Sequence, residues 1–354
     1  MITNVKSING QNVKFGPGLR RGIADELRGI GASRALLLST PQQADICLEL
    51  ASAVGEMAAG VFTRATMHTP VDVTRDALEH AQSIGADSIV AVGGGSTIGL
   101  GKAIALQTGL PQIAVPTTYA GSEATPILGQ TAEGVKTTLT DPEILPDIIL
   151  YDPELVATLP AAMTVTSALN AVAHAVEALY ARDRRTETTK LAQEGIQAFA
   201  TGLPKVVKNP LDLEARQQTL QGAWSCGTVL GQVGMALHHK LCHTLGGSLD
   251  LPHAETHAII LPHAIAYNER DIPELLAPVA EILNGADASQ ALWDFSKNLG
   301  APMALQDLGV NENDLERVVE IALCNPYWNP REIDAEGLKG LLLRALYGER
   351  PRIV

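Results

Sequence analysis

The chain has 354 residues and a formal net charge of −13 at pH 7, from 26 basic and 39 acidic side chains. This excess of negative charge argues against nucleic acid or an anionic membrane surface as a partner. With 46% hydrophobic and 18% charged residues, the composition is that of a globular protein long enough for two domains. An anionic small substrate would therefore need local cations where it binds.

The cysteines give no sign of a structural framework. They are scattered along the chain without a paired spacing, at Cys47, Cys226, Cys242 and Cys324. This argues against disulfides or a thiolate zinc site and favours a reducing compartment. The N-terminus lacks the apolar segment of a signal peptide, and no stretch reaches about eighteen apolar residues. We expect a cytoplasmic protein.

The first part of the chain alternates short β-branched segments with amphipathic ones. Strands are predicted at residues 34–40, 61–69, 87–95, 111–118 and 147–152. Such alternation predicts a parallel sheet covered by helices on both faces. Residues 129–140 interrupt the rhythm and predict a β-hairpin that turns at Glu133–Gly134.

From about residue 154 the pattern changes to long, Ala-rich segments of helical period, and no strand is expected up to the C-terminus. The sequence therefore predicts two domains. An α/β dinucleotide-binding domain with a parallel sheet spans residues 1–156, and an all-α domain spans residues 157–354.

A possible cofactor site lies in IVAVGGGSTIGLGKAIAL, residues 89–106, where a buried strand meets a helix through three glycines. Gly94 and Gly95 would let the backbone approach a ligand, and the amides of the first helical turn, with Ser96, favour an anion. A dinucleotide pyrophosphate is such an anion. A plain chain reversal gives the same pattern, and the motif is not the common GxGxxG.

A second loop, residues 115–127, also follows a predicted strand and is rich in hydroxyl groups, from Thr117, Thr118, Ser122 and Thr125. These groups could bind a ribose or a carboxamide, or only stabilise the loop. Because ligands of open α/β sheets bind at the carboxyl ends of the strands, the two loops together predict nucleotide binding. The first strand ends at Ser39–Thr40 without an acidic residue, so NADP(H) is allowed as well as NAD(H).

The stretch HHKLCHTLGGSLDLPH, residues 238–253, holds four of the nine histidines. On a helix, His239 and His243 share one face, and Lys240 lies beside His243. We expect Gly246–Gly247 to break this helix and a loop to return His253 to the cluster.

An earlier helical segment carries Asn170 and His174, again four residues apart. These side chains meet the later histidines only if the two helices pack together. A divalent metal would favour a carboxylate among the imidazoles, whereas Asn170 supplies a neutral amide, which is a poor ligand. Three histidines could still hold zinc, so a metal site is weakened and not excluded.

With these motifs, and with VKFGPG, HAVEAL and NPYWNPR elsewhere, the chain resembles the iron-containing alcohol dehydrogenase family, and most closely its maleylacetate reductase branch. The resemblance runs essentially end to end. It implies the dehydroquinate synthase-like fold of that family, a dinucleotide domain followed by a helical one, with the active site in the cleft between them. It also implies a homodimer.

Three departures separate this chain from the metal-dependent members of the family. Gly99 stands where the motif GGGSxxDxxK has its aspartate, Asn170 stands at the position of a metal-ligand aspartate, and the loop PTTYAGSE is one residue shorter. The maleylacetate reductases are similar in all three respects, so the resemblance implies that no metal is bound.

The activity implied is NAD(P)H-dependent reduction of the carbon–carbon double bond of maleylacetate, a small dicarboxylate, to 3-oxoadipate in aromatic compound degradation. The alternatives are a metal-dependent alcohol or aldehyde dehydrogenase on the same scaffold and a catalytically silent NAD-binding protein. By position, the resemblance places Gly94, Gly95 and Ser96 at the pyrophosphate, Thr117, Thr118 and Thr125 beside the nicotinamide, and Lys136 near the ribose.

Hydride addition to this conjugated ketone generates an enolate, whose negative charge needs hydrogen-bond donors if no metal is present. The candidates are His243 and His253, with Lys240 as the cation for a substrate carboxylate. His174, His238, His239 and Asn170 are interpreted as the remnant of a metal pocket that now shapes hydrogen bonds to the second carboxylate. Tyr119 is expected to face the substrate, and His257 and His263 are expected to be structural.

Overall fold

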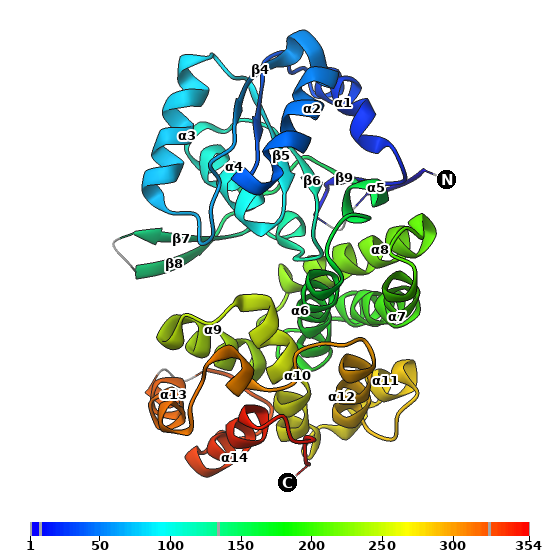
Figure 1. Cartoon of the computed structure of the whole chain (residues 1–354), viewed down its shortest axis with the longest axis vertical. Helices are drawn as coiled ribbons and strands as arrows, with labels where there is room; N and C mark the ends of the chain where they lie inside the picture. Colours follow the sequence, from blue (N-terminus) through cyan, green and yellow to red (C-terminus); the bar gives the residue numbers. More distant parts are fainter. Residues whose placement is uncertain (1, 7–8, 133–134, 325–326, 354) are drawn as a thin grey trace. The chain divides into compact units, whose positions relative to one another are not determined.

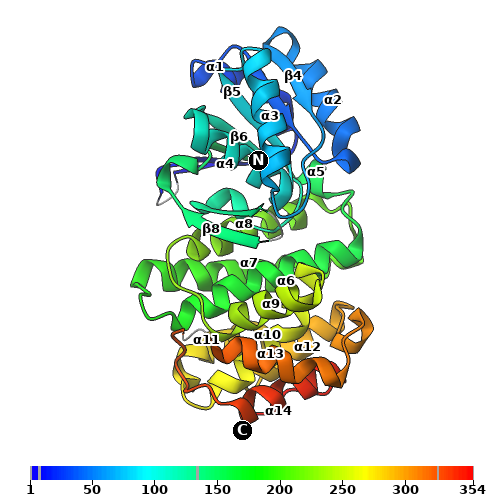
Figure 2. The same cartoon turned by 90° about the vertical axis from the view of Figure 1, so that its left-hand side faces the viewer.

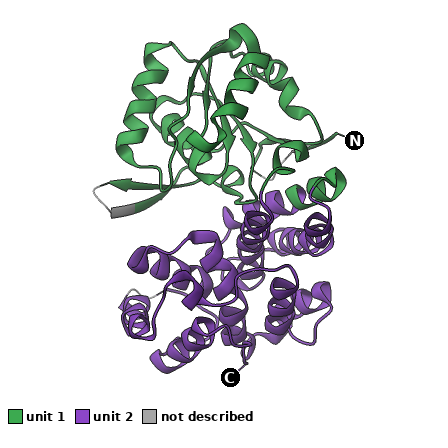
Figure 3. Ribbon diagram, viewed as in Figure 1, with its two compact units in different colours: residues 1–159, 211–220 green, residues 160–210, 221–354 purple. Residues whose placement is uncertain are grey.

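The computed structural model describes residues 2–6, 9–132, 135–324 and 327–353, and it divides into two compact units (Figure 3). Unit 1 comprises residues 1–159 and 211–220, and unit 2 comprises residues 160–210 and 221–354. The boundary predicted after residue 156 lies close to the first division. The assignment of residues 211–220 to unit 1 was not predicted, because it depends on tertiary contacts and not on local pattern.

Unit 1 contains a sheet with strand order β1-β2-β9-β6-β5-β3-β4, in which β1 and β2 pair antiparallel and the other neighbours are parallel. The strands are β1 (Thr3–Lys6), β2 (Asn12–Phe15), β3 (Ala35–Leu38), β4 (Ala58–Phe62), β5 (Ser88–Gly93), β6 (Gln112–Pro116) and β9 (Ile148–Tyr151). The predicted parallel sheet is confirmed, although β1 and β2 were missed. The strand expected over residues 61–69 was wrong in extent: β4 ends at Phe62, and His68 and Thr69 adopt positive φ angles that no strand allows.

Helices cover both faces of this sheet (Figure 1). Along β3, Leu37 packs against α1 (Ile23–Gly29) and α2 (Ala44–Val54) on one side. Its neighbour Leu36 packs on the other side, against α3 (Val71–Ser83) and α4 (Gly95–Thr108). The alternation follows from the two-residue period of a strand.

The predicted hairpin is formed by β7 (Ile127–Ala132) and β8 (Val135–Thr140), which pair antiparallel with Ala132 opposite Val135. Its expected turn at Glu133–Gly134 lies outside the described residues. The short helix α5 (Pro153–Val156) follows β9.

In the described part of unit 2 every regular element is a helix, so the predicted all-α domain is confirmed (Figure 2). The helices are α6 (Ala161–Tyr180), α7 (Thr186–Lys208), α8 (Leu213–Leu230, which begins in unit 1), α9 (Leu237–Leu249), α10 (His253–Glu269), α11 (Pro273–Leu283), α12 (Ala288–Asn298), α13 (Glu312–Cys324) and α14 (Ala335–Leu346). No helix among the described residues is both long and apolar enough to cross a membrane.

Helix α6 is the central helix of unit 2: it packs against α7 and α10 and is buried on nearly all sides from Thr164 onward. Helix α9 packs with α10, α13 and α14 around an apolar core. The expected break at Gly246–Gly247 was wrong, because α9 continues to Leu249 and ends where Asp250 adopts a left-handed conformation. Packing of α9 against this core outweighs the low helix propensity of two glycines.

Candidate functional site

The glycine-rich turn of unit 1 has the predicted local structure, since β5 ends at Gly93 and α4 begins at Gly95. A Cβ atom at Gly93 would lie 2.3 Å from Thr97 Oγ1, and one at Gly94 would lie 2.9 Å from the side chain of Thr118. Packing by itself is therefore enough to require glycine at positions 93 and 94, whether or not a ligand binds. Ser96 is half-buried at the start of α4. Its proposed ligand stays a prediction.

The hydroxyl-rich loop after β6 uses some of its groups within unit 1. Thr117 Oγ1 accepts a hydrogen bond from Gln43 Nε2 at 2.5 Å, and Thr125 Oγ1 accepts one from Lys102 Nζ at 3.1 Å. Both threonines are buried, whereas Thr118 and Ser122 are half-buried. Among the other predicted cofactor residues, Ser39 is completely buried, and the side chain of Lys136 lies outside the described residues.

Lys102, which sequence reasoning missed, holds this loop against α4. It is completely buried and donates to the carbonyl oxygens of Ser122, Thr125 (2.8 Å) and Ile127 (3.0 Å). Burial lowers the pKa of Lys102 to about 7, and the nearby carboxylate of Glu123 opposes that shift. The sequence signal was its position on an otherwise apolar helix, where an ammonium group needs internal acceptors.

The structure accounts for one departure from the metal-dependent family members. A Cβ atom at Gly99 would lie 2.5 Å from the hydroxyl oxygen of Thr69. Thr69 is buried and has a φ of 44°, an uncommon conformation for a β-branched residue. The place of a side chain at position 99 is therefore taken by Thr69.

Tyr119 does not have the exposure expected of a substrate-facing residue. Its side chain is completely buried, and its hydroxyl accepts hydrogen bonds of 3.0 Å from Arg216 Nη1 and Thr219 Oγ1 at the start of α8. Both partners belong to unit 1. The contacts favour a role in fastening residues 211–220 to this unit.

In unit 2 three helices bring six imidazoles together, and we refer to this set as the histidine cluster. It consists of His174 on α6, His238, His239 and His243 on α9, and His253 and His257 on α10. Ring centroids lie 5.1 Å apart for His174 and His239, and 4.2 Å apart for His253 and His257. The expected convergence of the two helical segments is thus observed, and His257, expected to be structural, is part of the cluster.

Burial favours the neutral form of three histidines of the cluster, His174, His238 and His257. Desolvation, helped by the neighbouring imidazoles, lowers the pKa of His238 to about 3 and lowers the pKa values of His174 and His257 well below the usual value. Five polar atoms here are buried without a hydrogen-bond partner among the described residues: Asn170 Oδ1, His174 Nδ1, His238 Nδ1, His239 Nε2 and His257 Nε2. Such atoms point to a ligand, since buried polar groups are normally paired.

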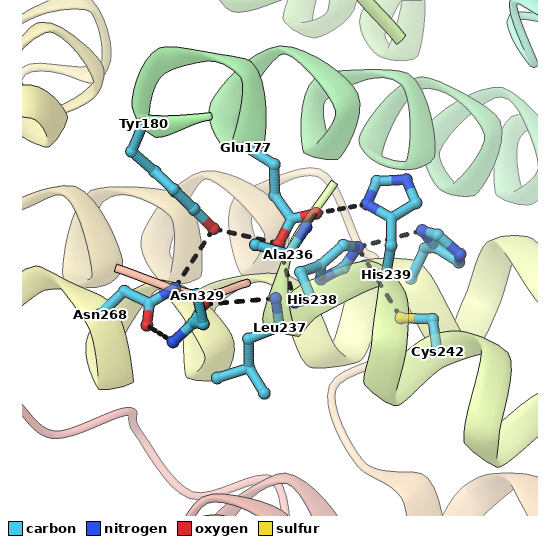
Figure 4. Close-up of polar contacts among 10 residues, drawn as sticks. Glu177, Tyr180, Ala236, Leu237, His238, His239, Cys242, Asn268 and Asn329 are labelled. Carbon is cyan, nitrogen blue, oxygen red and sulfur yellow. Dashed lines mark hydrogen bonds and ion pairs between the residues drawn. The ribbon is translucent and has the colours of Figure 1, made fainter. Parts of the chain in front are cut away.

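Glu177, on the same face of α6 as Asn170 and His174, was also missed. Its carboxylate is completely buried and accepts a hydrogen bond from His239 Nδ1 at 2.7 Å (Figure 4). Burial alone would raise the pKa of Glu177. The hydrogen bond from His239, electrostatic attraction to His239 and His238, and the hydrogen bond from the Ala236 amide outweigh this effect and lower the pKa to about 2. The spacing of residues 170, 174 and 177 was the signal that could have found it.

The outer members of the cluster are exposed. His243 and His253 are both exposed, with ring centroids 6.3 Å apart and nearly parallel rings. Lys240 is half-buried, and its Nζ lies 5.2 Å from the centroid of the Tyr327 ring, a cation–π contact. Of the predicted donors, His243 lies on α9 together with the predicted cation Lys240, and His253 begins α10.

The residues at the family's metal-ligand positions differ from the group of potential ligand atoms that the structure gathers. Asn170 offers an amide, and within the described chain the potential ligand atoms of His174, His239 and His253 are not gathered within 4.8 Å of one another. Among those residues, the atoms that are gathered belong to His238, Cys242 and His257. They already bond one another, with His238 Nε2 3.0 Å from His257 Nδ1 and 3.7 Å from Cys242 Sγ.

Family models match both parts of the chain. Residues 10–153 match that of the iron-containing alcohol dehydrogenases, and residues 164–346 match that of the family's C-terminal region. The chain belongs to the iron-containing alcohol dehydrogenase family. The expected family and fold are thereby confirmed, as is the expectation of an oxidoreductase. Membership of an iron-containing family gives no support to the expected absence of a metal.

Within the iron-containing alcohol dehydrogenase family, the chain is highly similar to several maleylacetate reductases. The chain is 56% identical over 339 residues to a maleylacetate reductase of Rhizobium sp. (strain MTP-10005), covering 96% of each chain. It is 48% identical, with the same coverage, to a maleylacetate reductase of Sphingobium indicum. The crystal structure of a maleylacetate reductase from Agrobacterium tumefaciens is 56% identical and superimposes with a TM-score of 0.95, over 99% of this chain and 100% of that one.

Proposed function

We propose that this protein reduces the carbon–carbon double bond of maleylacetate to 3-oxoadipate with NADH or NADPH. The observation that carries the proposal is the 56% identity to a maleylacetate reductase over nearly the whole chain. The histidine cluster supports it with groups suited to a dicarboxylate that becomes an enolate. The cytoplasmic location, the homodimer and the role in aromatic compound degradation are further parts of the proposal.

Unit 1 would hold the cofactor at the carboxyl ends of β5 and β6. The backbone amides around Gly94, Gly95 and Ser96 would bind the pyrophosphate, because they open a helix of fourteen residues with its positive end toward the loop. Thr118 and Ser122, both half-buried, are the hydroxyls best placed for the nicotinamide side. Bound NAD(P)H supplies the hydride.

The protein's own task is to accept the negative charge that appears on the substrate. A new C–H bond forms at the carbon β to the ketone, the π electrons move to the ketone oxygen, and an enolate results. His243 and His253, exposed and adjacent, would donate hydrogen bonds to that oxygen. A proton then adds to the α carbon and restores the ketone, so that one hydride and one proton are consumed in each turnover.

The two carboxylates of the substrate would need cations in a protein of net charge −13. Lys240 lies one helical turn before His243 and would bind one of them. The amide NH2 of Asn170 and Nδ1–H of His174 would donate hydrogen bonds to the other, as would Nε2–H of His239 when that ring is protonated.

The test is a spectrophotometric assay of NADH and NADPH oxidation with maleylacetate. We expect rapid oxidation with at least one of them and formation of 3-oxoadipate as the product. A protein that oxidises neither cofactor with maleylacetate, yet oxidises them with simple aldehydes, would contradict the proposal.

We further propose that the reaction requires no metal, because an amide replaces the acidic ligand at Asn170 and the histidines at the other ligand positions are not gathered. One observation favours the alternative of a metal-dependent alcohol or aldehyde dehydrogenase: the donor atoms of His238, Cys242 and His257 lie within 4.8 Å of one another. Metal analysis of the protein and of its C242S variant separates the two. A stoichiometric metal that is lost in C242S together with turnover would favour the alternative.

A further inference from the structure

We propose that Glu177 is a positioning residue for the reaction, which fixes the ring of His239 so that its Nε2 atom is the one offered to the substrate. The substrate in this statement rests on the proposed function. The orientation of His239 rests on the contacts of the Glu177 carboxylate alone.

Both carboxylate oxygens of Glu177 are fully used. Oε2 accepts from His239 Nδ1 (2.7 Å) and from the backbone N–H of Ala236 (3.0 Å). Oε1 accepts from the backbone N–H of His238 (2.8 Å) and from the hydroxyl of Tyr180 (3.1 Å). Four donors around one buried group define its position more strictly than a single ion pair could.

Two of these bonds place the helix that carries the cluster. Helix α9 has no side-chain cap of its own at Ala236. Glu177, from α6, bonds the amides of Ala236 and His238 in its stead and lies at the positive end of the helix dipole (Figure 4). The position of His239, Lys240 and His243 therefore depends on a carboxylate from another helix.

The remaining bond decides which ring nitrogen of His239 is available. A carboxylate with four donors can only accept, so Nδ1 of His239 carries a proton whether the ring is neutral or charged. Nε2 is then the nitrogen left for a ligand. This atom is buried and has no hydrogen-bond partner among the described residues, and the same is true of Asn170 Oδ1 and His174 Nδ1.

A second layer keeps the carboxylate in place. Asn268 and Asn329 bond each other through both amides, at 2.7 and 3.0 Å. Asn268 also bonds the Tyr180 hydroxyl, and Asn329 accepts from the amide of Leu237, each at 3.4 Å. A network this complete is what preorganisation of a functional side chain requires.

Unit 2 contains a matched control. Glu269 is also buried and accepts from two backbone amides, those of Ala288 and Ser289, at the start of α12. The bonds of Glu269 in the described chain involve no imidazole. At both positions a Glu→Gln change replaces one carboxylate oxygen that accepts from a helix N-terminal amide. Only at position 177 does the same carboxylate also bond an imidazole, that of His239.

The experiment compares E177Q, E177D, E269Q, H239N and the double variant E177Q/H239N. We expect E177Q to lower kcat with maleylacetate by about 10- to 100-fold, as for lost outer partners of functional histidines, while the Kd of NADH stays the same. E177D, which keeps the charge, should recover part of the loss, and E269Q should stay within about twofold. If Glu177 acts mainly through His239, adding E177Q to H239N should lower kcat by no more than the about twofold allowed for a lost helix-capping oxygen.

The second readout is the protonation of the ring nitrogens in ¹⁵N-histidine NMR spectra, with the His239 signals assigned from H239N. We expect Nδ1 of His239 to be protonated in the wild type and in E269Q, and to lose that fixed state in E177Q. Equal kinetic losses in E177Q and E269Q, or a wild-type His239 protonated on Nε2 alone, would overturn the proposal. The wild-type spectrum decides even if E177Q does not fold, and it is independent of whether maleylacetate is the substrate.

Discussion

The two units of this protein build their candidate sites from different parts of the chain. In unit 1 the groups offered to a ligand are backbone amides and hydroxyls next to strand ends, at residues 93–96 and 116–125. In unit 2 they are side chains that start on three helices and meet only after folding. Backbone sites follow from local sequence, whereas the histidine cluster depends on how α6, α9 and α10 pack. We therefore expect substitutions to act differently in the two units.

The largest effect is expected for H243A in unit 2. Loss of one oxyanion donor typically costs about 3–4 kcal/mol of transition-state stabilisation, or roughly two to three orders of magnitude in rate. Binding of NADH, which unit 1 would provide, should not change. Steady-state assays with maleylacetate and a fluorescence titration with NADH measure the two quantities. Equal weakening of turnover and NADH binding would contradict the division of roles between the units.

The stability of unit 2 should fall in mild acid. Burial lowers the pKa values of His238 and His263 to about 3, so the unfolded chain binds more protons than the folded one between about pH 6.5 and pH 3. This contribution is complete above pH 6.5 and is lost as the pH falls. Two such histidines would cost up to about 4 kcal/mol between pH 6.5 and pH 5.

The carboxylate of Glu177 adds to this at lower pH. Its folded pKa of about 2 lies below the ordinary value of 4.5, so its contribution is present above about pH 4.5 and is lost toward pH 2. Tryptophan fluorescence reports on the right unit, because Trp224, Trp293 and Trp328 all belong to unit 2. A midpoint of urea unfolding that stays constant from pH 7 to pH 5 would show that His238 and His263 are not desolvated in the folded protein.

A smaller effect is expected for G99A in unit 1. The new methyl group would meet the Thr69 hydroxyl, and such overpacking costs about 1–3 kcal/mol. The T69A change removes the hydroxyl and should restore stability in the double variant. A methyl group added at Gly247 in α9 would meet no atom within 4 Å, so G247A should be neutral or stabilising by up to about 1 kcal/mol. Thermal unfolding measures the stability of G99A, T69A, the double variant G99A/T69A and G247A. A G99A protein as stable as the wild type would contradict the packing at Thr69.

The same contrast explains what the sequence could predict. Hydrophobic runs and glycines predicted the parallel sheet, the hairpin and the turn at Gly94, because local periodicity encodes them. The short strands β1 and β2 have too few residues to produce a period. Helix spacing placed His239 and His243 on one face, and the resemblance placed them beside His174.

Lys102 and Glu177 were not predicted, for a shared physical reason. A charged residue on an apolar helix reads as a solvated position unless the partners that bury it are known, and those partners are far away in sequence. Glu177 is bonded by residues about 60 positions later, and Lys102 by a loop about 20 positions later. The burial of Tyr119 was not predicted for the same reason, because its partners lie on α8.

The central claim is that side chains of unit 2, and no transition metal, accept the negative charge of the reduced substrate. The most direct measurement is turnover of maleylacetate by protein treated exhaustively with a chelator, with metal content determined on the same sample. We predict full activity at far less than one metal ion per chain. Activity that disappears with the metal and returns on addition of Fe²⁺ or Zn²⁺ would contradict the claim.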